Sequence, residues 1–212
     1  MCYNALMSFG MISLITVCAL IVYLCVNVYL AFFGVAPFVP TPMKAVHEAL
    51  KHAKIKKGDI VYDLGAGDGR FLHFAEKDYG AHAIGYEVDP GVFLYAKLKQ
   101  WLFGWKGTMI RANFKTKNIK NADVIVCYMM THSLKKLQGF FEKQIAGGTR
   151  VVSYVFEIGD LKPKKIIPKD RKSGIGRIVV YGNADFIALL GALRLSDAAK
   201  HVMICRYICI LI

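Results

Sequence analysis

Charged side chains are missing from the first 43 residues of this 212-residue chain, which hold no Asp, Glu, Lys or Arg. Residues 9–33 form an almost continuous apolar run, longer than the ~20 residues that a helix needs to cross a bilayer. A cleavable signal peptide would have a basic residue before a shorter apolar core, and a mitochondrial transit peptide would be rich in arginine. Both features are missing, so we expect residues 1–36 to form a single-pass transmembrane anchor.

Positive charge begins directly after this segment. The chain carries 28 Lys and Arg against 15 Asp and Glu, a net charge of +13, and all of it lies downstream of the apolar run. Basic residues flanking a span favour the cytoplasmic side, so we expect the rest of the chain there, or on the matrix side in a mitochondrion. The charge suits anionic lipid headgroups or a solvated lysine face. Because basic and aromatic residues do not interleave, no nucleic-acid partner is expected.

Metal and disulfide patterns are also lacking. The six cysteines include no C-x-x-C pair, and three of them fall in the apolar segment. His47 and His52 stand one residue too far apart for the H-E-x-x-H pattern that places two zinc ligands on one helix face. We therefore expect neither a metal site nor a disulfide framework.

The most informative pattern is V-Y-D-L-G-A-G-D-G-R, from Val61 to Arg70. An apolar strand that breaks into alternate glycines and then opens a helix lets the backbone approach a ligand above the strand end. A dinucleotide fold would have glycine where Arg70 stands, and a P-loop would continue into Gly-Lys-Ser or Gly-Lys-Thr. Both of those nucleotide-binding classes are disfavoured.

The spacing D-x-G-x-G-x-G resembles the first motif of class I S-adenosylmethionine methyltransferases. The resemblance implies S-adenosyl-L-methionine as the cofactor, with Asp63 orienting its amino group. Gly65 and Gly67, with Ala66 between them, are expected to pass beneath its amino-acid end. A second apolar run closes on Glu87, at the distance where a ribose diol needs an acceptor, although a solvated strand-end charge is the alternative.

Alternating apolar runs predict an α/β fold, a parallel sheet with helices on both faces. We expect it to be a Rossmann-like, seven-stranded but shortened class I methyltransferase sheet with one N-terminal transmembrane helix. Residues 37–58 would form a connector and a helix over the cofactor site, 59–181 the methyltransferase domain, and 182–212 a tail of unknown role. Strands are expected at 59–64, 82–87, 107–112, 122–128, 149–156 and 176–181, and helices at 69–78, 90–103 and 133–145.

A narrower resemblance comes from the uncharged N-terminal span, the connector P-F-V-P-T-P and the glycine turn together. They are similar to membrane-anchored lysine methyltransferases that modify the c subunit of ATP synthase and the adenine nucleotide translocase. This resemblance covers about residues 20–181 and implies a membrane-protein substrate. It also makes Thr41 a candidate for the cofactor pocket, while capping of the following helix is an equal alternative.

The chain departs from the pattern of that group in two places, after the third strand and after the fourth strand. Asn113 stands where an acid is expected near the adenine amino group, and its carbonyl oxygen still accepts a hydrogen bond. Phe114 is expected on the adenine ring, with core packing as the alternative. After the fourth strand, the chain lacks the Asn/Asp-Pro-Pro-Tyr signature of many amino methyltransferases. Tyr128 is the candidate catalytic residue there, because ligands bind outside the carboxyl ends of parallel strands, and packing is the alternative. Asp68 is a further candidate, or a cap of the following helix. Methyl transfer to a lipid or quinone, and cofactor binding without catalysis, remain open.

Overall fold

The computed structural model describes residues 2–32, 38–129, 131–145, 148–159 and 161–182. The chain divides between Val39 and Pro40 into two units. The first holds α1 (Cys2–Phe32), in which the stretch Gly10–Val28 has a mean hydropathy of 2.5 and no buried side chain. By length and composition α1 is able to cross a membrane. The tail expected at 182–212 lies outside the described residues beyond Gly182.

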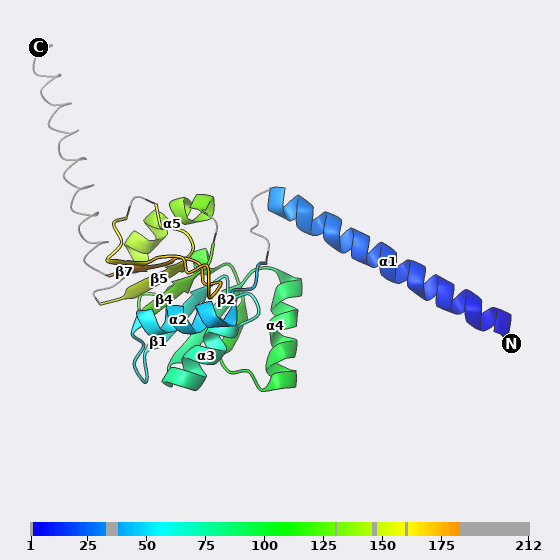
Figure 1. Ribbon diagram of the computed structural model, residues 1–212, viewed down its shortest axis with the longest axis horizontal. Helices are drawn as coiled ribbons and strands as arrows, with labels where there is room; N and C mark the ends of the chain where they lie inside the picture. Colours follow the sequence, from blue (N-terminus) through cyan, green and yellow to red (C-terminus); the bar gives the residue numbers. More distant parts are fainter. Residues whose placement is uncertain (1, 33–37, 130, 146–147, 160, 183–212) are drawn as a thin grey trace, which may run out of the picture. The chain divides into compact units, whose positions relative to one another are not determined.

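The second unit is built on a seven-stranded sheet with helices on both faces (Figure 1). Its strands are β1 (Ile60–Leu64), β2 (His82–Glu87), β3 (Thr108–Arg111), β4 (Val124–Cys127), β5 (Arg150–Tyr154), β6 (Lys165–Ile167) and β7 (Ile178–Tyr181). Its helices are α2 (Met43–Ala53), α3 (Arg70–Tyr79), α4 (Pro90–Phe103) and α5 (Thr131–Gln144), with one turn of 3-10 helix, η1 (Phe114–Thr116). The strand order is β3-β2-β1-β4-β5-β7-β6.

The alternation of strands and helices predicted parallel pairing, and the first five strands pair in parallel. The prediction is incomplete for the last two: β7 pairs antiparallel with β5, and β6, which the sequence did not indicate, pairs antiparallel with β7. A parallel return needs a crossover connection, usually a helix. The described residues between Phe156 and Lys172 hold no helix, so the chain returns antiparallel.

Two apolar cores lie on opposite faces of the sheet. Side chains alternate along each strand, so Val61 and Val124 belong to one core and Tyr62 and Ile125 to the other. The first core also takes the buried apolar residues of α2 and α3 and Ala96 of α4, and the second takes the buried apolar residues of α5. Figure 1 shows α2 and α3 on one side of the sheet and α5 on the other.

Helix α2 differs from its prediction at the N-terminal end. Pro42 occupies the N-cap position rather than the first helical position, and no side chain caps the helix. The capping alternative for Thr41 is therefore wrong, because the helix begins one residue later than that role requires. Asp89 caps α4, with Oδ1 accepting from the N–H of Val92 at 2.8 Å and Pro90 following.

The strand order reverses between β1 and β4, since the chain moves from β1 to β2 in one direction and later places β4 on the other side. In open α/β sheets, ligands bind at such a switch point, outside the carboxyl ends of the strands. Asp63 lies there, paired in register with Gly85 of β2 and Val126 of β4.

Candidate functional site

The glycine turn links the end of β1 to the start of α3. Gly65, Gly67 and Gly69 have φ values of 85°, 57° and 81°, a left-handed conformation that favours glycine. The N–H groups of Gly65 and Ala66 both donate to the carbonyl oxygen of Tyr86 at 2.9 Å, which folds the turn back over β2. Apart from its two neighbours in the chain, no atom of the described residues lies within 4 Å of the place where a Cβ on Gly65 would stand. A ligand can therefore approach the backbone there closely.

Asp63 lies buried beneath this turn, with 2% of its surface exposed. Its Oδ2 has no hydrogen-bond partner among the described residues. Burial, then the nearby carboxylates of Glu87 and Asp68, raise the pKa of Asp63 to about 8. A buried, unsatisfied carboxyl in an acidic neighbourhood suits a cation with N–H donors, and the ammonium of an amino acid has both properties. The site thus fits the amino-acid end of S-adenosylmethionine.

Glu87 ends β2 and is almost buried. Its Oε2 accepts from the N–H of Gly67 at 2.9 Å, and its Oε1 accepts from the N–H groups of Val88 and Asp89 at 2.9 Å each. The solvated-charge alternative is wrong, because only 9% of the residue is exposed. Glu87 stabilises the turn through this hydrogen bond, and its contact with the ribose hydroxyls stays a prediction.

Ala66 and Gly85 show why the turn sits so close to β2. A Cβ on Gly85 would stand 2.6 Å from the Cβ of Ala66 and 2.7 Å from Cδ1 of Leu72. Glycine at position 85 therefore lets the turn and α3 pack directly on the strand. The Ala66 methyl faces this contact, so any cofactor contact of Ala66 would come from its backbone.

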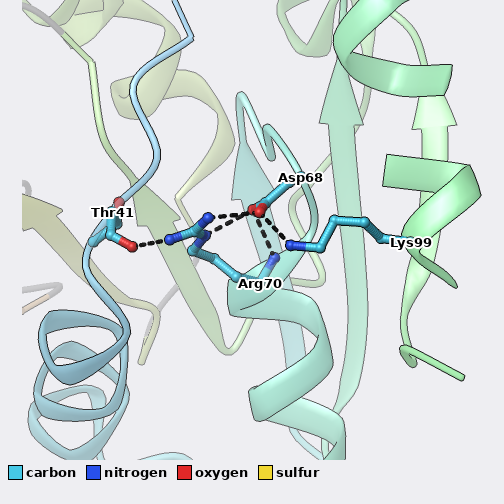
Figure 2. A network of polar contacts seen from close by, with 4 residues as sticks. All are labelled: Thr41, Asp68, Arg70 and Lys99. Carbon is cyan, nitrogen blue, oxygen red and sulfur yellow. Dashed lines mark hydrogen bonds and ion pairs between the residues drawn. The ribbon is translucent and has the colours of Figure 1, made fainter. Parts of the chain in front are cut away.

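A network of ion pairs beside the turn was not predicted from the sequence (Figure 2). The carboxylate of Asp68, 1% exposed, accepts from Nε and Nη2 of Arg70 at 2.8 and 2.6 Å and from Nζ of Lys99 at 2.7 Å. Nη1 of Arg70 donates to the backbone carbonyl oxygen of Thr41. Burial by itself would raise the pKa of Asp68, but the hydrogen bonds and charges of Arg70 and Lys99 lower it overall. Asp68 is therefore held ionised.

This network connects three elements: the connector before α2, the start of α3, and α4. Thr41 is buried, with 4% exposure, and the hydrogen bond from Arg70 places it beside the start of α3. Its contact with the cofactor stays a prediction. Of the three charged residues in the network, the sequence singled out only Asp68, as a further site candidate or a helix cap. Arg70 stands two residues after Asp68, where a dinucleotide motif has its third glycine, but this position does not by itself indicate an ion pair.

The other three predicted residues lie after β3 and β4. Oδ1 of Asn113 accepts from the N–H of Lys115 at 3.1 Å and caps η1, so this oxygen already has one donor. Phe114 is half-buried and meets Phe140 edge-on, with ring centroids 5.6 Å apart. The structure thus supports packing for Phe114, while contact with adenine stays a prediction.

Tyr128 follows β4 and is half-buried in an aromatic group. Its ring meets that of Tyr154 edge-on at 5.0 Å and lies near-parallel to that of Phe156 at 6.5 Å. Burial, and secondarily Tyr154, raise the pKa of the Tyr128 hydroxyl, which therefore stays protonated at neutral pH. Such a hydroxyl can orient a substrate by hydrogen bonding but does not act as a strong base.

The chain is similar to known methyltransferases. The family model of the ANTKMT methyltransferase domain matches residues 63–165. A protein-lysine N-methyltransferase of Saccharolobus islandicus is 37% identical over 134 residues, 62% of this chain and 83% of that protein. A Mus musculus lysine N-methyltransferase, named for the c subunit of ATP synthase, is 28% identical over 123 residues, 57% of this chain and about half (49%) of that protein.

A solved structure has the same fold and a bound cofactor product. It is an RNA methyltransferase from Salinibacter ruber in complex with S-adenosyl-L-homocysteine. It superposes with a TM-score of 0.62 at 28% sequence identity, covering 68% of this chain and 92% of that one.

Proposed function

Because the chain belongs to the family of S-adenosylmethionine-dependent protein-lysine N-methyltransferases with the ANTKMT methyltransferase domain, we propose that its acceptor is a lysine of a membrane protein. The observation that carries this proposal is α1, whose apolar stretch Gly10–Val28 has no buried side chain and so has no place in a soluble core. The Mus musculus relative, named for the c subunit of ATP synthase, supports a protein acceptor of this kind.

In this proposal α1 anchors the enzyme in the membrane that holds its substrate. The lysines that follow, beginning with Lys44, favour the cytoplasmic or matrix side for the catalytic domain. Residues 37–58 lie over the cofactor, which is supported by the hydrogen bond from Arg70 to the Thr41 carbonyl oxygen. The catalytic domain is 59–181.

Bound S-adenosylmethionine supplies an electrophilic methyl group on a sulfonium, so the protein's main task is alignment. We assign Asp63 to the ammonium of the cofactor, because Oδ2 lacks a donor and its burial disfavours an unpaired charge. Glu87 is assigned to the ribose hydroxyls. Its Oε2 has one protein donor, and a carboxylate oxygen accepts about two.

The acceptor lysine must reach the methyl group as a neutral amine, although its usual pKa is about 10.4. Burial of the ammonium against an aromatic group lowers that pKa by desolvation. The half-buried rings of Tyr128 and Phe156, which follow β4 and β5, offer such a surface, and Tyr128 packs edge-on against the buried Tyr154. The Tyr128 hydroxyl then accepts a hydrogen bond from the amine and directs its lone pair at the methyl.

The test supplies methyl-labelled S-adenosylmethionine and source membranes to the detergent-solubilised full chain, then separates protein, lipid and RNA. Label in a membrane-protein band, recovered as methyl-lysine on hydrolysis, is the expected result. Label in lipid or a quinone would replace the acceptor assignment, and label in RNA would match the chemistry named for the Salinibacter ruber protein.

Two variants make the result specific. Asp63→Asn should abolish labelling, because it removes the charge assigned to the cofactor ammonium. Asp123→Asn is the matched control: Asp123 accepts from the N–H of Ile60 at the opposite end of β1, so its loss leaves the site intact. Equal labelling by both variants would contradict the role of Asp63.

A further inference from the structure

The outward face of α4 is apolar. Leu94, Tyr95, Leu98, Trp101 and Leu102 have the spacing of one helix face, and all five are exposed. The exposure reaches 68% at Leu94 and 78% at Trp101. The buried residues of α4, Val92 and Ala96, lie on the opposite face. Scattered exposed apolar side chains are ordinary, but a contiguous stripe of five large ones marks an interaction surface.

The chemistry of this stripe suits a lipid interface. Trp101 and Tyr95 combine an apolar ring with a polar group, which is the combination enriched where membrane meets water. The exposed Lys97 on the same helix and the exposed Lys106 just after it can reach anionic headgroups. Leucine and tryptophan on one face with lysine beside them are typical of helices that lie in the bilayer surface.

The position of α4 in the fold also favours contact with lipid. Lys99 on its inner side binds Asp68, Asp68 binds Arg70, and Arg70 binds the carbonyl of Thr41 (Figure 2). The chain arriving from α1 is thus fixed to α4 through three side chains. Thr41 is the ninth residue after Phe32, and nine residues reach at most about 30 Å. This connection is too short for Thr41, and for the helix α4 that is linked to Thr41, to lie far from a bilayer that holds α1.

We propose that the outward face of α4 lies in the interface of the bilayer that α1 spans, with Trp101 at the boundary of headgroups and acyl chains. The inference rests on the membrane anchoring proposed above. A second contact of this kind orients the catalytic domain toward the membrane surface, so that it selects lysines close to the bilayer. A protein partner on the same face is the competing occupant.

Intrinsic fluorescence tests this directly, because the chain has two tryptophans, Trp101 and Trp105. Trp105 is half-buried: it stacks on His73 at 4.9 Å, and Nζ of Lys99 lies 3.7 Å from its ring centroid. The full chain is reconstituted into phosphatidylcholine and phosphatidylglycerol vesicles, with or without bromine atoms near the headgroup end of the acyl chains. Trp105→Phe leaves Trp101 as the reporter, and Trp101→Phe leaves Trp105 as the matched control.

Brominated lipid should quench most of the emission of the Trp105→Phe variant and little of that of the Trp101→Phe variant. If the protein floats with the vesicles but Trp101 is not quenched, the face does not contact lipid and the inference is overturned in favour of a protein partner. Equal quenching of both variants would also overturn it, since Trp105 is shielded in the assigned orientation. Failure to float with vesicles would remove the anchoring proposal and this inference with it.

Discussion

The backbone N–H of Gly67 donates to Oε2 of Glu87 at 2.9 Å, joining the glycine turn to the end of the neighbouring strand. The other oxygen of Glu87 holds the first two backbone N–H groups of the following loop, those of Val88 and Asp89. One carboxylate therefore shapes both loops at the switch point of the sheet. Because a carboxylate has about four acceptor positions, one of them is still free for a ligand hydroxyl.

Glu87→Ala should weaken both cofactor binding and the fold. The buried N–H of Gly67 would lose its acceptor, at a cost of about 1–3 kcal/mol in the free energy of unfolding. Loss of a ribose contact of similar energy would lower cofactor affinity by roughly tenfold or more. Calorimetric titration and thermal melting measure the two effects separately. Glu87→Gln keeps one acceptor oxygen, so its free energy of unfolding should fall less than its cofactor affinity does. Unchanged cofactor affinity in both variants would refute the ribose assignment.

Asp63→Asn should change the pH dependence of stability in the absence of cofactor. Burial, reinforced by Glu87 and Asp68, raises the pKa of Asp63 from 3.8 to about 8. Between those two values the folded state holds a proton that the unfolded state has released, so the free energy of unfolding falls as pH rises. Asparagine does not titrate, and the variant should lose less stability over that range than the wild type.

Thermal melts from about pH 5 to pH 8 measure this slope. Asp123→Asn should keep the wild-type slope, because it leaves Asp63 buried and ionisable. Adding S-adenosylmethionine should flatten the wild-type slope, since a cation beside Asp63 favours its ionised form. Identical slopes for wild type and Asp63→Asn without cofactor would mean that Asp63 is already ionised at neutral pH.

Gly85→Ala should destabilise the domain by about 1–3 kcal/mol, because the added methyl would overlap Ala66 and Leu72 at 2.6 and 2.7 Å. Gly139→Ala is the matched control within α5. A Cβ on Gly139 would meet nothing within 4 Å, and alanine in a helix is favoured over glycine by about 0.5–1 kcal/mol. In denaturant titrations, the unfolding midpoint should therefore fall for Gly85→Ala and rise for Gly139→Ala. A rise of both midpoints would contradict the close packing of the turn on the strand.

The parts of the site that are close in sequence were predictable. Asp63 and the glycines are encoded within a few residues, and the buried end of β2 follows at a fixed interval, which made Glu87 visible. Each of these positions depends on local backbone geometry that glycine or a strand end imposes. The α/β class and six of the seven strands followed from the same alternation, since element type is the most regular signal in an α/β chain. The number seven came from the resemblance to class I methyltransferases.

Contacts between distant residues were not predictable. Arg70 binds Thr41, which is 29 positions away in the sequence, and Lys99 binds Asp68, which is 31 positions away. Lysine and arginine are mostly exposed in proteins, and nothing in the local pattern distinguishes a buried pair from the other basic residues. β6 was missed for a similar reason: it is three residues long and begins at a lysine, so its pairing with β7 defines it more than its composition does.

Asp68→Asn should cost about 3 kcal/mol of stability, because it leaves the largely buried charges of Arg70 and Lys99 without their carboxylate. Glu157→Gln is the matched control. The distance from its Oε1 to Nη1 of Arg177 is 2.7 Å, the same as that from Oδ2 of Asp68 to Nζ of Lys99. Both side chains of the control pair are about 40% exposed, so the free energy of unfolding should fall by less than about 1 kcal/mol. Urea titrations at neutral pH compare the two.

The same pair of variants gives a second check through pH. The lowered pKa of Asp68 means that its stabilising effect is present above the ordinary aspartate value and is lost as pH falls through the lowered one. The stability difference between wild type and Asp68→Asn should therefore shrink in acid. A difference independent of pH would show that packing, and not the ion pairs, holds the connector at Thr41.

Tyr128→Phe should lower kcat with little change in cofactor affinity. The ring keeps its edge contact with Tyr154 and its stacking near Phe156, while the hydroxyl assigned to the acceptor amine is removed. One lost hydrogen bond of about 1.4 kcal/mol in the transition state corresponds to roughly a tenfold decrease in rate. Single-turnover methylation at saturating cofactor measures this step. Tyr62→Phe removes a hydroxyl that bonds Asn121 and faces the other core, and it should leave the rate unchanged. A wild-type rate in Tyr128→Phe would assign Tyr128 to packing alone.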